Sequence, residues 1–117
     1  MGVQVVHVTE AKQDVLARDV ERADSTRKQL QGVMFRSSLP SGYGLVFPFE
    51  TAKNRGVHML FVRVPIDVIW TVDEEVTAVG RLKPWTGYGR NQADRIIELS
   101  AGTATDVSVG DRVVVQE

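Results

Sequence analysis

The sequence contains no cysteine among its 117 residues. This absence excludes a disulfide framework, a thiolate zinc site and a cysteine nucleophile. It also fits a reducing compartment, so we expect a cytoplasmic protein. No apolar run approaches the roughly 20 residues that a membrane span requires, and the N-terminal residues lack the basic region of a signal peptide. We therefore expect no association with a membrane.

Also lacking is an excess of charge of one sign, because 14 basic residues face 15 acidic ones and the net charge is −1. Such a balance provides no field that would attract nucleic acid. Histidine is scarce as well: His7 and His58 are the only two, and neither has carboxylates at ligand spacing. We therefore expect no nucleic-acid partner, no metal ion and no cofactor.

What the sequence does have is apolar residues that alternate every two positions, the pattern of half-buried strands. Strands this short, separated by turn residues, are typical of a sandwich or a small barrel. The length fits one domain over residues 1–117. We predict a mainly β, antiparallel β-sandwich or barrel-like fold. The predicted strands are 3–8, 15–20, 45–49, 57–62, 68–72, 76–82, 95–99 and 111–115.

One short helix is predicted to begin after residue 24. Residues 24–26 provide N-cap side chains, and the spacing of Thr26 and Gln29 matches a capping box. Gly32 suits a position with positive φ just past the helix, which limits the helix to about two turns. A second helical turn is compatible with residues 103–107.

Large apolar side chains on these periods form the predicted core. Burying each contributes about 1.5–3 kcal/mol, and truncating Phe61 or Trp70 to alanine is expected to cost about 3–5 kcal/mol. The predicted core comprises Val5, Leu16, Leu30, Met34, Leu45, Phe47, Met59, Phe61, Val68, Trp70, Val76, Ile97, Leu99 and Val113.

Four segments carry a further signal: Gln31–Arg36, Gly44–Phe47, His58–Trp70 and Ile97–Val113. They resemble, in order, the elements of the uncharacterised family called domain of unknown function 192. Those elements are Gly-Leu-Met-x-Arg, then Gly-Met-Leu-Phe-x-Phe, then Trp-Met with Ile-Pro-Leu-Asp-Ile-x-Phe, and finally Leu-Glu-Leu-x-x-Gly with Gly-Asp.

The resemblance covers about residues 15–116 and implies a compact, mainly antiparallel β domain with no established activity. The sequence departs from the family pattern at two points. His58 stands where the family has an aromatic residue, and Asp73-Glu74 replaces an Asp-Gly turn. The missing glycine favours a turn other than the glycine-dependent type I′.

His58 and Asp67 flank the junction between two apolar segments. A histidine oriented by a carboxylate can act as a general base, with Ser37 or Ser38 as the nucleophile. The alternative interpretation is structural. In that case Asp67 binds backbone amides near Pro65, and His58 is a paired core residue.

The segment Lys83–Arg90 is the best candidate for a binding loop, because it combines two aromatic residues, two cations and two glycines. Trp85 and Tyr88 can stack on a flat ligand while Arg90 contacts an anionic group. Alternatively, the two aromatic side chains fold back and close the end of the sandwich.

Arg36 and Arg63 are a third candidate pair. A partly buried arginine requires a carboxylate, which Asp67 or Glu98 can supply. The two interpretations are a structural ion pair and an anion-binding pocket.

Taken together, these features predict a non-enzymatic binding module for a small polar ligand or a peptide, held beside Trp85, Tyr88 and Arg90. One alternative is a protein-interaction module that adds a partner strand to an exposed edge beside Pro48. Another is a hydrolase that uses His58 and Asp67. The protein is expected to be a monomer or a weak homo-oligomer.

Overall fold

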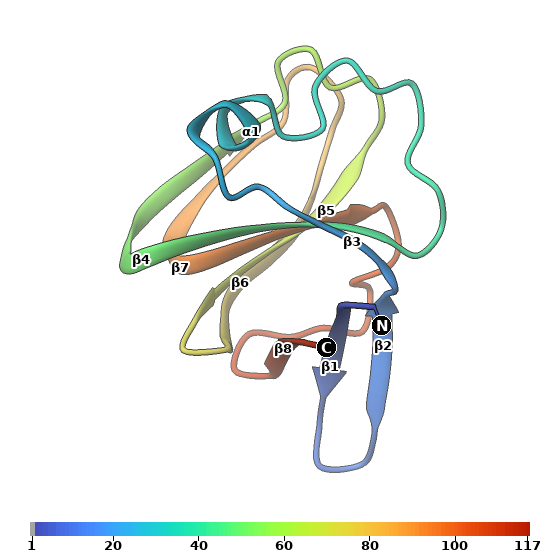
Figure 1. Ribbon diagram of the computed structural model, residues 1–117, viewed down its shortest axis with the longest axis vertical. Helices are drawn as coiled ribbons and strands as arrows, with labels where there is room; N and C mark the ends of the chain where they lie inside the picture. The colour runs from blue at the N-terminus through green and yellow to red at the C-terminus, as the bar shows by residue number, and fades with distance from the viewer. Residues whose placement is uncertain (1) are drawn as a thin grey trace.

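The two-residue alternation forms eight strands in the computed structural model, which describes residues 2–117 (Figure 1). The mainly β fold with one short helix is therefore confirmed. The elements are β1 (Gln4–Val8), β2 (Gln13–Ala17), β3 (Asp19–Arg22), α1 (Thr26–Gln31), β4 (Tyr43–His58), β5 (Ile66–Val72), β6 (Glu75–Leu82), β7 (Tyr88–Ser100) and β8 (Arg112–Gln116).

All eight strands belong to one sheet with the order β2-β1-β8-β6-β5-β7-β4-β3. The prediction of a purely antiparallel sheet is wrong at one place, because β3 and β4 run parallel. The two outer strands of this order, β2 and β3, are consecutive in the chain and only Arg18 separates them. The carbonyl of Gly42 accepts hydrogen bonds from the amides of both Arg18 and Asp19 at 3.0 Å. One continuous segment thus bounds both ends of the sheet and makes it barrel-like.

The long strand β4 replaces two of the predicted strands. It continues from Tyr43 to His58 and pairs with β7 along most of its length. Its register shifts between Pro48 and Lys53, so the β4–β7 ribbon bends there. The predicted strand over 57–62 is wrong beyond His58, because residues 59–65 form a loop before β5.

Helix α1 is as short as predicted, but its N-cap is Ser25 rather than Thr26. The Ser25 hydroxyl accepts a hydrogen bond from the Lys28 amide at 3.2 Å. Instead of completing a capping box, the Gln29 side chain donates to the carbonyl of Ala23 at 3.0 Å. Gly32 ends the helix with φ 52°, as predicted.

Apolar residues gather on both faces of the sheet. The inner cluster draws on seven of the eight strands and includes Ile69, Ile97 and Leu99. The outer cluster, which contains Trp70 and Met59, lies between the sheet, the residues after α1 and the 59–65 loop. Strand β5 contributes to both clusters, so it is central in the fold.

The predicted core is confirmed for most of its members, with two clear exceptions. Leu30 is 73% exposed, because α1 is too short to bury any of its own residues. Phe61 is 46% exposed, since it lies in the 59–65 loop instead of a strand. Leu16 and Met34 are only partly buried against the two clusters.

Two turns also differ from their predictions. Asp73 and Glu74 form the two-residue β5–β6 turn with φ values of 50° and 71°. Positive φ at both central positions is the signature of a type I′ turn, so the expectation of another turn type is wrong. Residues 103–106 belong to a run of turns over 101–106, so no helix forms at 103–107.

Candidate functional site

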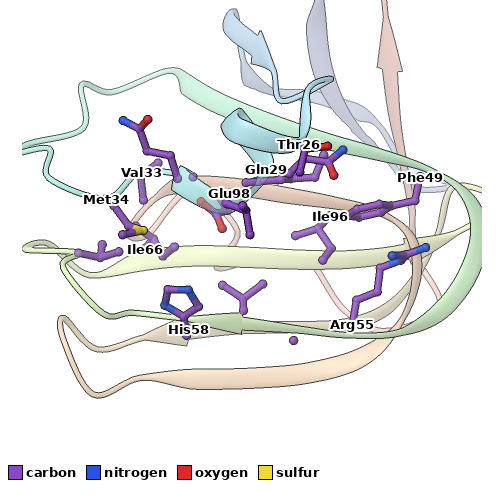
Figure 2. Close-up of a pocket in the computed structure, with 17 residues that line it drawn as sticks. Thr26, Gln29, Val33, Met34, Phe49, Arg55, His58, Ile66, Ile96 and Glu98 are labelled. Carbon is purple, nitrogen blue, oxygen red and sulfur yellow. The ribbon is translucent and has the colours of Figure 1, made fainter.

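A cleft of about 350 Å³ lies between α1 with the residues after it and the β4–β7 ribbon (Figure 2). It opens on the side of the outer apolar cluster, and most of its wall is apolar. The lining residues are Thr26, Gln29, Leu30, Gln31, Gly32, Val33, Met34, Phe47, Phe49, Arg55, Gly56, Val57, His58, Val62, Ile66, Ile96 and Glu98.

Glu98 is the one acidic residue in the cleft wall. Its neighbours Ile97 and Leu99 fill the inner cluster, so strand alternation directs Glu98 to the opposite face. The side chain is only 5% exposed, and within residues 2–117 its Oε1 atom has no hydrogen-bond partner. Burial raises the pKa of Glu98 to about 8, against a smaller lowering by the charge of Arg36. The carboxyl is therefore mostly protonated at pH 7.

Gly32 leaves the carboxyl of Glu98 uncovered on the side of α1. A Cβ atom at this position would stand 3.4 Å from Glu98 Oε1 and 3.6 Å from Phe47 Cζ. The φ of 52° also lies in the left-handed region, which favours glycine. The backbone thus favours glycine at this position, whereas a Cβ would fit in ordinary van der Waals contact with the carboxyl.

Arg55 and His58 stand on the β4 wall of the cleft, as Figure 2 shows. The Arg55 guanidinium donates to the carbonyls of Ala93 at 2.9 Å and Thr51 at 2.8 Å. It also lies 3.7 Å from the centre of the Phe49 ring. These contacts hold Arg55 in place without a carboxylate partner.

The structure does not bring His58 and Asp67 together. His58 lines the cleft, and its Nδ1 atom accepts a hydrogen bond from the Leu60 amide at 3.2 Å. Ile66 also lines the cleft, so its neighbour Asp67 faces the other side of β5. The two side chains therefore do not form a catalytic dyad.

Asp67 has a structural role on that opposite side. Its carboxylate accepts from Arg81 Nε at 2.9 Å, from the Gly102 amide at 3.0 Å and from the Ala104 amide at 2.9 Å. These bonds connect β5 to β6 and to the turn after β7. The amides belong to this turn rather than to the neighbourhood of Pro65.

The predicted binding loop is shorter than expected, because β7 already begins at Tyr88. Trp85 and Tyr88 are about half exposed, so neither closes the end of the sheet. The Tyr88 hydroxyl accepts a hydrogen bond from Arg90 Nη1 at 3.4 Å, and both side chains lie outside the cleft. Their role as ligand contacts stays a prediction.

Trp85 belongs to a surface cluster of three aromatic residues. Its ring centre lies 5.5 Å from that of Phe61, which in turn lies 5.3 Å from that of Phe35. All three have positive φ, at 65°, 61° and 69°, and each such backbone costs about 1–2 kcal/mol. Sequence reasoning missed this cluster because the three residues lie on separate loops that meet only in the fold.

Arg36 and Arg63 do not share a site. Arg36 Nη2 donates to Glu21 Oε1 at 2.9 Å, and the Tyr43 hydroxyl donates to the same oxygen at 2.7 Å. The ion-pair interpretation is right for Arg36, but the partner is neither Asp67 nor Glu98. Arg63 is exposed, and no ion pair to it exists within residues 2–117.

Neither a metal centre nor a membrane-spanning helix occurs within the described residues. No group of three or more His, Cys, Asp or Glu side chains in that part of the chain is arranged to hold a metal ion. His7 instead forms a 2.7 Å contact with Asp111. Across residues 2–117, the single helix is too short to span a bilayer.

The fold and the cleft together define a small β protein with one nearly closed sheet and a ligand-sized cleft around a buried carboxyl. The chain belongs to the family domain of unknown function 192, described as uncharacterized ACR, whose model matches residues 6–115. The resemblance inferred from the four segments is thereby confirmed.

Relatives of known sequence agree with this assignment. A UPF0127 protein of Pyrococcus furiosus is 38% identical over 115 residues, which cover 93% of this chain and 95% of that protein. A UPF0127 protein of Pyrococcus abyssi is 36% identical, and the match covers 92% of this chain and 95% of that protein.

Two crystal structures share the fold. One, from Sinorhizobium meliloti 1021, is named as a candidate transcription regulator. It superposes with a TM-score of 0.86 at 21% identity, and the match covers 98% of this chain and 94% of that protein. The other is a protein of unknown function from Novosphingobium aromaticivorans. It superposes with a TM-score of 0.80 at 22% identity, and the match covers 95% of this chain and 83% of that protein. At these identities the likeness shows the fold alone.

Proposed function

We propose that this protein is a non-enzymatic binding module that holds a small polar molecule, or a short piece of a peptide, in the cleft between α1 and the β4–β7 ribbon. The observation that carries the proposal is the unpartnered Oε1 atom of Glu98, buried in the wall of a ligand-sized cleft. A buried polar atom without a partner is costly, and a ligand that bonds to it removes that cost. A mostly apolar cleft with few polar groups is the usual form of a small-molecule site.

The chemistry of the wall favours binding over catalysis. Among the described residues the cleft wall offers Glu98 no serine nucleophile, because Ser37 and Ser38 do not line it and its one hydroxyl is that of Thr26. The separation of His58 from Asp67 removes the support for a hydrolase. A general acid without a positioned second group does not make a hydrolytic site.

Amide NMR with a fragment library of sugars, nucleotides, amines and carboxylates tests this proposal. Bound fragments are expected to shift the amides of Gly32, Val33 and Ile96, which surround Glu98. Shifts confined to residues 83–90 would instead place the ligand beside Trp85 and Tyr88. A library without any shift at either place would contradict the binding module.

A second candidate site is the surface cluster of Phe35, Phe61 and Trp85, because three half-exposed rings are in contact there, Phe35 stacked on Phe61 and Phe61 edge to face with Trp85. This cluster would present a flat apolar face next to Tyr88 and Arg90, as the predicted loop site requires. Pairing with a partner strand has less support. The edges that lack a partner strand within residues 2–117 include the outer strands β2 and β3, which are short, and β4 beyond Val46, where the β4–β7 ribbon bends. Short or bent edges are poor templates for an added strand.

A further inference from the structure

We propose that the cleft selects a small organic cation, an ammonium or guanidinium group on an apolar body, and that Glu98 is the residue that recognises its charge. The inference rests on the proposed function, because it names the class of ligand for the same cleft. It makes Glu98 the specificity-determining residue, while the apolar wall accepts the body of the ligand.

The unsatisfied bonding of Glu98 indicates a ligand that donates. Glu98 Oε1 has no hydrogen-bond partner within the described residues, and the nearby cations are already engaged. Arg36 is bonded to Glu21, and Arg55 is bonded to two carbonyls above the Phe49 ring. Ammonium and guanidinium groups have only donors, so they complement a carboxylate that lacks a partner. An anionic ligand would meet the carboxylate with the wrong sign.

The walls of the cleft determine the body of the ligand. Beside Glu98 stand Ile96 from the same strand face, Phe47 from β4 and Val33 from the segment after α1. The volume of about 350 Å³ lies at the lower end of the range for small-molecule sites. An aromatic ring on a two-carbon stem fits such a space, with its charged end next to the carboxyl.

The protonation state of Glu98 predicts that ligand affinity depends on pH, which selection by shape alone would not produce. Burial raises the pKa of Glu98 to about 8, so the carboxyl must lose a proton before it can pair with a cation. Binding of a cation should therefore release a proton at pH 7 and strengthen as the pH rises from 6 to 8. The gain in affinity follows the ionised fraction of Glu98, which increases by more than about tenfold between pH 6 and pH 8.

Other titratable groups face this position and need control. The charge of Arg36 lowers the pKa of Glu98, the charge of Glu98 in turn raises the pKa of Tyr43, and Arg55 and His58 stand on the β4 wall. The residues that β5 and the α1 segment contribute to the wall carry no charge. Because these groups are unchanged in Glu98→Gln, the difference between the pH profiles of that variant and of the wild type isolates the contribution of Glu98.

Three probes of one shape separate charge from fit: 2-phenylethylamine, 2-phenylethanol and 3-phenylpropionate. Dissociation constants are measured by amide NMR on the full chain at pH 8, where half of Glu98 is ionised. We expect the amine to bind at least about tenfold more tightly than the alcohol, which is about 1.4 kcal/mol, and the carboxylate not to shift the cleft amides. Glu98→Gln should reduce the amine to the affinity of the alcohol.

Matched controls keep the outcome interpretable. Glu75→Gln removes an exposed carboxylate outside the cleft and should leave the tenfold preference intact. The amide spectrum of Glu98→Gln first verifies that this variant is folded. The amine affinity of the wild type should rise from pH 6 to 8, and that of Glu98→Gln should stay flat.

Each contrary result has a definite meaning. Equal affinity for amine and alcohol in the wild type overturns the selection of cations but leaves the binding module standing. A preference that survives Glu98→Gln, or that is lost in Glu75→Gln, overturns the role of Glu98. If none of the three probes shifts the cleft amides, the inference is wrong, and the fragment library alone then decides the proposed function.

Discussion

Trp70 and Phe61 have the same apolar character in the sequence but opposite surroundings in the fold. Trp70 is buried in β5, and its indole nitrogen donates to the Arg55 carbonyl at 3.0 Å. Phe61 contacts the two other rings of the surface cluster and is nearly half exposed. The contribution of a large apolar residue to the free energy of unfolding therefore depends on whether the fold buries it.

We expect Trp70→Ala to lower the free energy of unfolding by about 3–5 kcal/mol, because it empties a buried site and leaves the Arg55 carbonyl unpaired. Phe61→Ala should cost about 1 kcal/mol or less, since half of the ring is already in water. Urea denaturation of both variants measures the difference. Equal losses at the two positions would contradict this assignment.

Glu98→Gln should change how stability depends on pH. The folded chain keeps a proton on Glu98 up to about pH 8, whereas the unfolded chain releases it near the ordinary glutamate pKa of 4.5. This contribution to stability is complete below about pH 4.5, declines as the pH rises towards 8, and is absent above 8. The decline is at most about 1.4 kcal/mol for each pH unit.

Glutamine does not titrate, so Glu98→Gln should gain stability relative to the wild type between pH 5 and 8. Denaturation curves recorded at several pH values measure this gain. Glu75→Gln provides the control, because its exposed carboxylate should give a difference that hardly changes with pH. Parallel curves for Glu98→Gln and the wild type would exclude a raised pKa at Glu98.

At the scale of single residues, the alternation in the sequence predicted most of the core but not the cleft. Ile97 and Leu99 follow the two-residue period, so their burial was predictable, and the same period sends Glu98 outward, where a glutamate is ordinarily solvated. Glu98 is buried only because α1 and residues of β4, which are distant in the sequence, pack over it. A signal was present in Gly32, whose missing side chain leaves room beside the carboxyl.

At the scale of elements, the β5–β6 turn adopts the type I′ conformation although it lacks the glycine that this conformation favours. Asp73 and Glu74 both adopt positive φ, the geometry for which glycine is favoured. The sequence argued against this turn because it lacks glycine. The strands on either side nevertheless impose it, since two linking residues between antiparallel strands leave few alternatives.

Comparing Glu74→Gly with Glu74→Ala isolates the strain in this turn. Both changes remove the 2.7 Å contact between Glu74 and Arg112, so that loss cancels in the comparison. Glycine adopts positive φ without a Cβ penalty, and the glycine variant should be more stable than the alanine variant by about 1 kcal/mol. Thermal or urea denaturation checks this. An alanine variant as stable as the glycine variant would show that the turn is unstrained.

Element boundaries were the least predictable part of the fold. The bend between Pro48 and Lys53 lets β4 continue through a segment that lacks clear alternation, and it therefore merges two predicted strands. The loop at 59–65 follows an apolar stretch that looks like a strand in the sequence. Local patterns contain no information on the partner strand β7, which decides where β4 ends.

At the scale of the whole molecule, closure of the sheet depends on a tight contact at Gly44. A Cβ there would stand 3.0 Å from Ala17 Cβ and 3.2 Å from Leu99 Cδ2, so β2, β4 and β7 meet at this point. We expect Gly44→Val to cost about 1–3 kcal/mol through overpacking. Gly80→Val is the control, because nothing lies within 4 Å of its Cβ position and valine suits a strand. Similar urea midpoints for both variants would show that the contact is not critical.

The joined strands β2 and β3 have a consequence for the rate of refolding. The ring of strands is completed only when β1 has met β8 from the far end of the chain and β3 has met β4. Such distant partners slow the search for the native state, and stopped-flow experiments should record refolding in milliseconds to seconds instead of microseconds. We expect the contact at Gly44 to form after the transition state, so its valine variant should refold at nearly the wild-type rate and unfold faster.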